Sequence, residues 1–232
     1  ASELVVEVTA ARPAPHLRGD PVGHLALEID GEVLERLPLA TGRQSVRAAL
    51  GRASLPHPVT VWLPHTAAVT IHAITADAPL EPAPMTGPRW VHYGSSISHA
   101  TDVVDPVGGW PIQAARALGL ELTSLAFAGN AMLDPFVARV IAEQPADLIT
   151  LKVGINPVNG DAFRRRTFLP ALHGFLDTVR DGHPSTLIVV ITALACPIHE
   201  DATGPTHEVS PGRAGATPRD IPEGDGSLTL RR

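Results

Sequence analysis

The sequence predicts an α/β domain with a doubly wound parallel sheet, preceded by an all-β, sandwich-like domain. Three observations predict this arrangement: alternating apolar runs before residue 77, a proline-rich stretch at 79–88, and unbroken apolar runs separated by helix signals after it. A chain of 232 residues is long enough for one or two domains with a sizeable core.

In the first part of the chain, apolar residues stand at every second position of short runs, at 4–8, 25–29, 59–63 and 69–73. Such alternation is typical of strands with one buried face. Asp30 and Gly31 lie between two runs and carry a strong hairpin signal, because both central residues of a type I′ turn need a positive φ. We therefore expect residues 1–78 to form a β-sandwich that is incomplete at its start.

Residues 79–88 contain four prolines, which favour an extended and semi-rigid connector. We place the domain boundary in this stretch and expect the α/β domain to occupy residues 89–232. Four runs rich in Val, Ile and Leu follow without clean alternation, as in strands that are covered on both faces, at 89–93, 121–126, 147–153 and 186–192.

Helix signals separate these four strands. Pro111 is typical of the first turn of a helix, and Gly119 of its end. Asp134 before Pro135 is typical of the start of a second helix. Residues 161–180 carry the apolar face of a third. Strand and helix in alternation indicate right-handed βαβ units. Ligands bind at the carboxyl ends of the strands in such sheets, so the loops there are where chemistry is expected.

Three of these loops carry residues suited to acyl chemistry. Ser95 and Ser96 follow the first strand, Gly129 follows the second and Asn156 follows the third. Taken singly, the serine loop and the asparagine loop are better explained as ordinary turns. Taken together, a hydroxyl, a glycine N–H and a side-chain amide at one sheet edge supply a nucleophile and two donors for a tetrahedral oxyanion.

The three motifs resemble those of the SGNH, or GDSL-type, hydrolase family, whose blocks occur in this order on a flavodoxin-like sheet. Residues 93–97 (Tyr-Gly-Ser-Ser-Ile) match the first block, 126–130 the second and 153–156 the third. The resemblance implies that Ser96 is the nucleophile and that the Gly129 N–H and the Asn156 amide form the oxyanion hole. Ser95 stands where the family usually has Asp.

The segment 90–205 also resembles a bacterial branch of the family with an N-terminal β-sandwich. This agrees with the all-β pattern of residues 1–78, for which the resemblance implies a jelly-roll-like domain and carbohydrate binding as a candidate role.

One block of the family is missing. Members end with an Asp-x-x-His block that supplies the general base, and this sequence contains none. We expect that the chain stops short of it, in a helix that Ser227 caps. His199 or His207 could instead serve as base, but a solvated loop with exposed histidines is the simpler interpretation. For His92 we likewise favour a packed residue over a base.

Composition and the lack of other motifs narrow the function further. A net charge of −6 gives no positive field for nucleic acid, and no apolar run is long enough to span a membrane. The single Cys196 excludes a disulfide-stapled scaffold. We predict no metal and no cofactor, because zinc-type spacings and the glycine-rich loops of nucleotide-binding proteins are missing. No signal peptide is visible, so we expect a cytoplasmic location.

Three functions are consistent with these residues. The first is a serine esterase that acts through an acyl-enzyme on a small ester, such as an acylated sugar or natural product. The second is an acyltransferase in which an acceptor hydroxyl replaces water. The third is a non-catalytic binder, whose β-sandwich holds carbohydrate and whose crevice lacks a working base. The partner expected in the two catalytic cases is a small-molecule ester.

Overall fold

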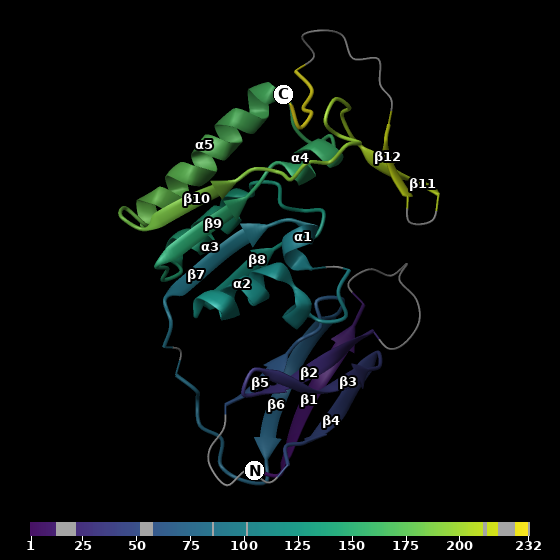
Figure 1. Cartoon of the computed structure of the whole chain (residues 1–232), viewed down its shortest axis with the longest axis vertical. Helices are drawn as coiled ribbons and strands as arrows, with labels where there is room; N and C mark the ends of the chain where they lie inside the picture. The colour runs from purple at the N-terminus through teal and green to yellow at the C-terminus, as the bar shows by residue number, and fades with distance from the viewer. Residues whose placement is uncertain are drawn as a thin grey trace. The chain divides into compact units, whose positions relative to one another are not determined.

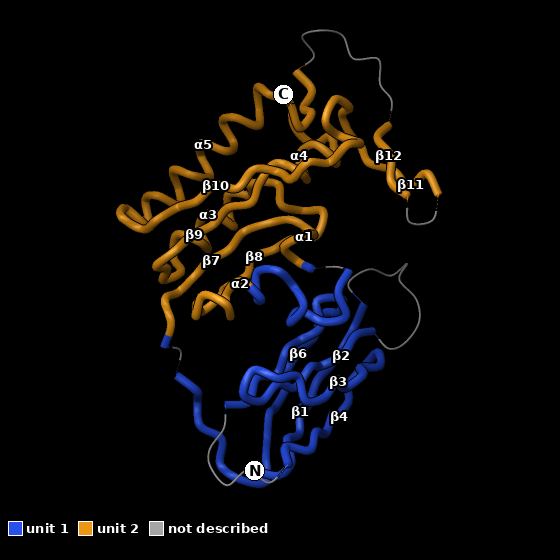
Figure 2. Tube along the Cα trace, viewed as in Figure 1, with its two compact units in different colours: residues 1–86, 100–113 blue, residues 87–99, 114–232 orange. Residues whose placement is uncertain are grey.

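The computed structural model describes residues 1–12, 22–51, 58–84, 86–100, 102–210, 213–217 and 226–231, and Figure 1 shows their helices and strands. Contacts within the chain divide it into two compact units, coloured separately in Figure 2. Unit 1 comprises residues 1–86 and 100–113, and unit 2 comprises residues 87–99 and 114–232. Residues 100–113 thus group with unit 1, and the domain boundary at 79–88 stays a prediction.

Unit 1 contains two antiparallel sheets of three strands each, ordered β4-β1-β6 and β3-β2-β5. The strands are β1 (Glu3–Ala11), β2 (Gly23–Ile29), β3 (Glu32–Leu39), β4 (Gly42–Ala49), β5 (Val59–Trp62) and β6 (Ala68–Ala76). Side chains of both sheets form one hydrophobic cluster, to which β1 gives every second residue from Leu4 to Ala10. The all-β character predicted for this part is confirmed.

The turn between β2 and β3 has the predicted geometry. Asp30 has φ +51° and Gly31 has φ +86°, as both central residues of a type I′ turn require. β4 was not predicted, because its buried positions are few: Val46 and Ala48 face the cluster, and polar residues fill most of the strand.

An ion pair attaches residues 102–113 to unit 1. Arg36 Nε in β3 lies 2.6 Å from Asp105 Oδ2, and the Asp105 side chain is only 4% exposed. Asp105 also accepts a hydrogen bond from the Val107 N–H at 3.1 Å, which caps the 3₁₀ turn η1 (Pro106–Gly108). A buried carboxylate is thus matched by one cation and one backbone donor.

The sheet of unit 2 has the predicted parallel arrangement. Its strands are β7 (Arg89–Gly94), β8 (Glu121–Ala126), β9 (Leu148–Lys152) and β10 (Leu187–Ile191), in the order β10-β9-β7-β8. All pairs are parallel. Numbered along the chain the order is 2-1-3-4, in which β7 and β9 are central, so the doubly wound, flavodoxin-like expectation is confirmed.

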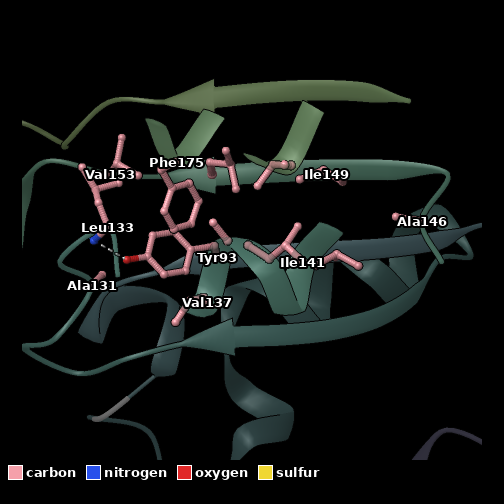
Figure 3. Close-up of a cluster of buried hydrophobic side chains, with 13 residues drawn as sticks. Tyr93, Ala131, Leu133, Val137, Ile141, Ala146, Ile149, Val153 and Phe175 are labelled. Atoms are coloured by element: carbon pink, nitrogen blue, oxygen red, sulfur yellow. Dashed lines mark hydrogen bonds between the residues drawn. The ribbon is translucent and has the colours of Figure 1, made fainter. Parts of the chain in front are cut away.

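The helices are α1 (Ser96–His99), α2 (Trp110–Leu118), α3 (Pro135–Glu143), α4 (Ile155–Asn159) and α5 (Arg165–Gly182). One face of the sheet packs on α3 and α5 in a hydrophobic cluster that includes Tyr93, Ile141, Ile149 and Phe175 (Figure 3). The predicted start of α5 at residue 161 is four residues early. Asp161 has φ +50°, outside the helical region, and Thr167 Oγ1 accepts from the Arg164 N–H to cap the true start.

Two features of the C-terminal part differ from the predictions. The segment that carries His199 and His207, expected as a solvated loop, leads at its end into strand β11 (Thr206–Ser210), which pairs with β12 (Arg213–Ala216). The helix expected after Ser227 is wrong for the described residues 226–231. Ser227 forms a β-bridge with Arg164, and the Leu230 N–H donates to the His199 carbonyl at 2.9 Å, so long-range partners replace helical hydrogen bonds.

We predict that Arg36→Ala destabilises the protein by about 1–3 kcal/mol, because it leaves the buried Asp105 carboxylate without its cation. Arg36→Lys keeps the charge and should recover part of the loss. Urea unfolding of the three proteins checks this, and an unchanged midpoint for Arg36→Ala would contradict it.

Candidate active site

The loops that follow β7, β8 and β9 leave the sheet at the same edge, because these strands are parallel neighbours. Two hydrogen bonds join them. The Phe127 N–H donates to the Gly94 carbonyl at 2.8 Å, and the Ala131 N–H donates to Asn156 Oδ1 at 3.0 Å. The structure therefore brings together the three loops that carry Ser96, Gly129 and Asn156.

Ser96 is the first residue of α1 and is half-buried. The N–H groups of Ser98 and His99 both donate to the Ser95 carbonyl, at 3.0 and 2.9 Å, which closes the helical turn around Ser96. This turn needs glycine at position 94. A Cβ there would lie 2.7 Å from the Ser98 Cβ and 3.0 Å from His92 Nε2, so any side chain would push α1 away from β7.

His92 connects α1 to the sheet through a buried hydrogen-bond chain. Trp90 Nε1 donates to Thr150 Oγ1 at 2.9 Å, His92 Nδ1 lies 2.6 Å from the same oxygen, and His92 Nε2 lies 2.8 Å from Ser98 Oγ. Burial, with a smaller contribution from the Lys152 charge, lowers the pKa of His92 to about 4. The imidazole is thus neutral at pH 7 and links Thr150 of β9 to Ser98 of α1 through its two ring nitrogens.

Two polar groups close to these strand ends are buried without a hydrogen bond to any described residue. They are the Ser95 hydroxyl and the Lys152 ammonium, in residues 1% and 5% exposed. Burial lowers the pKa of Lys152. Charge and polarity are therefore concentrated on the sheet face opposite to the α3–α5 cluster, where Lys152 follows Thr150 in the alternation of β9.

Gly129 lies in the turn after β8 and is exposed. Its φ is +72°, a backbone conformation that L-residues with a side chain rarely adopt. A Cβ built on it would meet no atom within 4 Å, so the space beside this backbone is open. An open, left-handed glycine lets a ligand approach the N–H groups of the turn closely.

Asn156 follows β9 in α4 and is 1% exposed. Because its Oδ1 accepts from the Ala131 N–H, the orientation of the amide is set and Nδ2 lies on the other side. The contact through Oδ1 thus orients an NH₂ donor beside the loop of Gly129, as an oxyanion site requires.

The two histidines considered as alternative bases have other roles. His199 is buried, with Nε2 2.7 Å from Thr206 Oγ1 and Nδ1 3.3 Å from the Ala202 carbonyl. It holds its own loop together and is not the exposed residue that was expected. His207 is exposed in β11, with Nδ1 3.3 Å from Thr217 Oγ1. His92, expected as a packed residue, is indeed 0% exposed.

Within the described ranges, no group of three or more His, Cys, Asp or Glu side chains is placed to hold a metal ion. Among the same residues no helix has the length and apolarity to cross a membrane.

His92→Gln should change how stability depends on pH. Between pH 6.5 and 4 the unfolded chain takes up a proton at His92 while the folded protein does not, so stability falls as pH decreases through this window. The shift corresponds to about 3 kcal/mol lost by pH 4. Urea unfolding at pH 7, 5.5 and 4 should show a smaller loss for His92→Gln than for the wild type; parallel profiles would contradict the buried neutral imidazole.

Comparison with known proteins was informative only at the level of structure. No family model matches the sequence, and no curated protein matches it. The salicylyl-acyltransferase SsfX3 from a tetracycline biosynthetic pathway matches with a TM-score of 0.70 and 32% identity, over 81% of this chain and 55% of its own. A family two carbohydrate esterase from Clostridium thermocellum, solved in complex with cellohexaose, has a TM-score of 0.65 and 15% identity, over 84% and 70%.

A GDSL-like lipase from Bacteroides ovatus matches with a TM-score of 0.62 and 21% identity, over 86% of this chain and 61% of its own. The chain thus spans little more than half the length of the acyltransferase. The order of the parallel sheet agrees with these structures at the level of the fold. The chain has an SGNH hydrolase-like fold.

Proposed function

We propose that this protein is a serine ester hydrolase that acts through an acyl-enzyme, with Ser96 as nucleophile. The observation that carries the proposal is the Asn156 amide, whose Oδ1 accepts from the Ala131 N–H in the loop of Gly129 and so sets the direction of its NH₂. The half-buried Ser96 at the start of α1, in the adjoining loop, supplies the hydroxyl.

In the proposed reaction, Ser96 Oγ attacks the ester carbonyl carbon and its proton passes to a base. The carbonyl oxygen becomes an oxyanion and accepts hydrogen bonds from the Asn156 NH₂ and from the N–H groups of Gly129 and Ser96. Collapse of this intermediate breaks the ester bond, and the protonated base gives its proton to the departing alcohol. Water, losing a proton to the same base, then attacks the acyl-enzyme; the bond between the acyl group and Ser96 Oγ breaks, the carboxylic acid leaves, and Oγ takes the proton back.

Neither buried imidazole is assigned as that base. His92 and His199 have both ring nitrogens within hydrogen-bond distance of other groups. The resemblance to the family assigns the role to an Asp-x-x-His block, which this sequence does not contain.

The substrate that we propose is an ester of a small acyl group with a sugar or natural-product hydroxyl. Two neighbours support this class by what their names say. One is a carbohydrate esterase solved with cellohexaose, and the other is a salicylyl-acyltransferase.

Acyl transfer is the second candidate, since the acyltransferase is the neighbour with 32% identity. It uses the same acyl-enzyme but replaces water by an acceptor hydroxyl. Product analysis of one activated ester, with and without an added sugar or polyketide alcohol, separates the two. Transfer that outpaces hydrolysis at millimolar acceptor favours the transferase.

A fluorophosphonate probe tests the nucleophile. We predict that the probe labels the wild type and Ser95→Ala, and fails to label Ser96→Ala, because phosphonylation needs an accessible hydroxyl beside oxyanion donors. Ser95 is the matched control: it is the adjacent serine, and its hydroxyl is buried. Equal labelling of Ser96→Ala would refute the role of Ser96 and favour the non-catalytic binder.

Asn156→Asp tests the oxyanion hole more sharply than Asn156→Ala. Aspartate keeps an oxygen that can accept from the Ala131 N–H and replaces the NH₂ donor by a second, negatively charged acceptor oxygen, whereas alanine removes both groups. We predict that either change lowers kcat about 10²- to 10³-fold, and that only alanine also loses the hydrogen bond to the loop. Steady-state kinetics together with thermal unfolding checks this; near wild-type kcat in Asn156→Asp would contradict it.

A further inference from the structure

We propose that the Tyr93 hydroxyl is a positioning group that sets the backbone of residues 127–134 and thereby the place of the Gly129 N–H. The proposal rests on the proposed function, because it assigns Tyr93 a role in oxyanion binding without contact to the substrate.

The first observation is a hydrogen bond inside an apolar cluster. The Leu133 N–H donates to the Tyr93 hydroxyl oxygen at 3.0 Å, drawn as the dashed line in Figure 3. Tyr93 is 0% and Leu133 is 3% exposed, so water cannot replace the bond. The aromatic ring packs on Phe127 and Phe175, with centroids 6.1 and 5.1 Å away. Phenylalanine would fill this space equally well, and among the described residues the hydroxyl is bound to the Leu133 N–H.

The second observation is the conformation of the turn. Leu133 has φ +60° and Gly129 has φ +72°, so two of its residues are left-handed. A leucine in this region is unfavourable and persists only where the surroundings hold it. Its buried N–H is held by Tyr93, which makes the hydroxyl the direct restraint on this conformation.

The third observation is how the rest of the turn is fastened. Its start is tied to β7 by the Phe127 N–H and the Gly94 carbonyl, at 2.8 Å. Its middle is tied to α4 by the Ala131 N–H and Asn156 Oδ1, at 3.0 Å. The end of the turn is bound to β7 by the hydrogen bond between the Leu133 N–H and the Tyr93 hydroxyl. Gly129 lies between Phe127 and Ala131, whose N–H groups make the first two of these hydrogen bonds. Loss of the bond at Leu133 would let Ala131 shift, and Gly129 and the Asn156 amide would shift with it.

Tyr93 is thus built to act on both proposed oxyanion donors at once. An oxyanion contact forms fully only in the transition state, so a misplaced donor lowers kcat more than it raises KM. A merely structural role for Tyr93 would lower thermal stability and leave kcat unchanged below the unfolding temperature.

The test compares Tyr93→Phe with Ile149→Val, a change in the same buried cluster that touches no hydrogen bond of the turn. For Tyr93→Phe we expect kcat for an activated ester to fall about 10- to 100-fold with KM changed less than about twofold. Ile149→Val should lower thermal stability and keep the wild-type kcat. Equal kcat in the two variants overturns the proposal.

Amide hydrogen exchange of the same proteins keeps this test independent of the proposed function. In Tyr93→Phe the amides of Gly129, Ala131 and Leu133 should exchange faster than in Ile149→Val, while those of β9 exchange alike. If the wild type neither turns over esters nor reacts with the fluorophosphonate, the proposed function fails, yet faster exchange still supports Tyr93 as the restraint on the turn. Unchanged exchange at these amides overturns it.

Discussion

The hydrogen bond between the Ala131 N–H and Asn156 Oδ1 decides the geometry of the whole candidate site. It joins the loop after β8 to the helix after β9, and it sets the direction of the NH₂ that we propose as an oxyanion donor. The bond is buried, so no water competes for either partner. A single interaction thus orders two loops and sets the direction of a donor.

Strand β7 supplies the remaining restraints from three consecutive residues. His92 and Tyr93 point to opposite faces, as alternation in a strand requires. His92 holds Ser98 in α1, and Tyr93 holds Leu133 in the turn after β8. Gly94 follows, where any Cβ would collide with Ser98. The central strand therefore fixes the serine loop from one face and the glycine loop from the other.

Much of the architecture could be predicted because local patterns and packing agree. Unbroken apolar runs and helix signals identified the four parallel strands, and the Asp30–Gly31 pair identified a hairpin. β4 and the β11–β12 hairpin could not be predicted, since none of the three carries a run of large apolar residues and their pairing partners define them. Residues 226–231 carry a helix-cap signal, but Arg164 and His199, distant in sequence, take their backbone groups.

In the candidate site too, local patterns predicted the loops, whereas hydrogen bonds to distant residues could not be predicted. Ser96, Gly129 and Asn156 were selected because they follow strand ends, and the structure places them in adjoining loops. The roles of His92, Tyr93 and Leu133 depend on hydrogen bonds across the fold, which no spacing encodes. One signal was available: a tyrosine and a histidine within an apolar central strand need buried partners for their polar atoms.

Lys152 has a practical consequence of another kind. It is the only lysine of the sequence, and its ammonium is inaccessible in the folded protein. Amine-directed dyes, cross-linkers and resins therefore find no side chain to react with until β9 separates from its neighbours. The side chain therefore reports on the opening of the sheet, since the other permanently charged cationic side chains are guanidinium groups that such reagents leave intact.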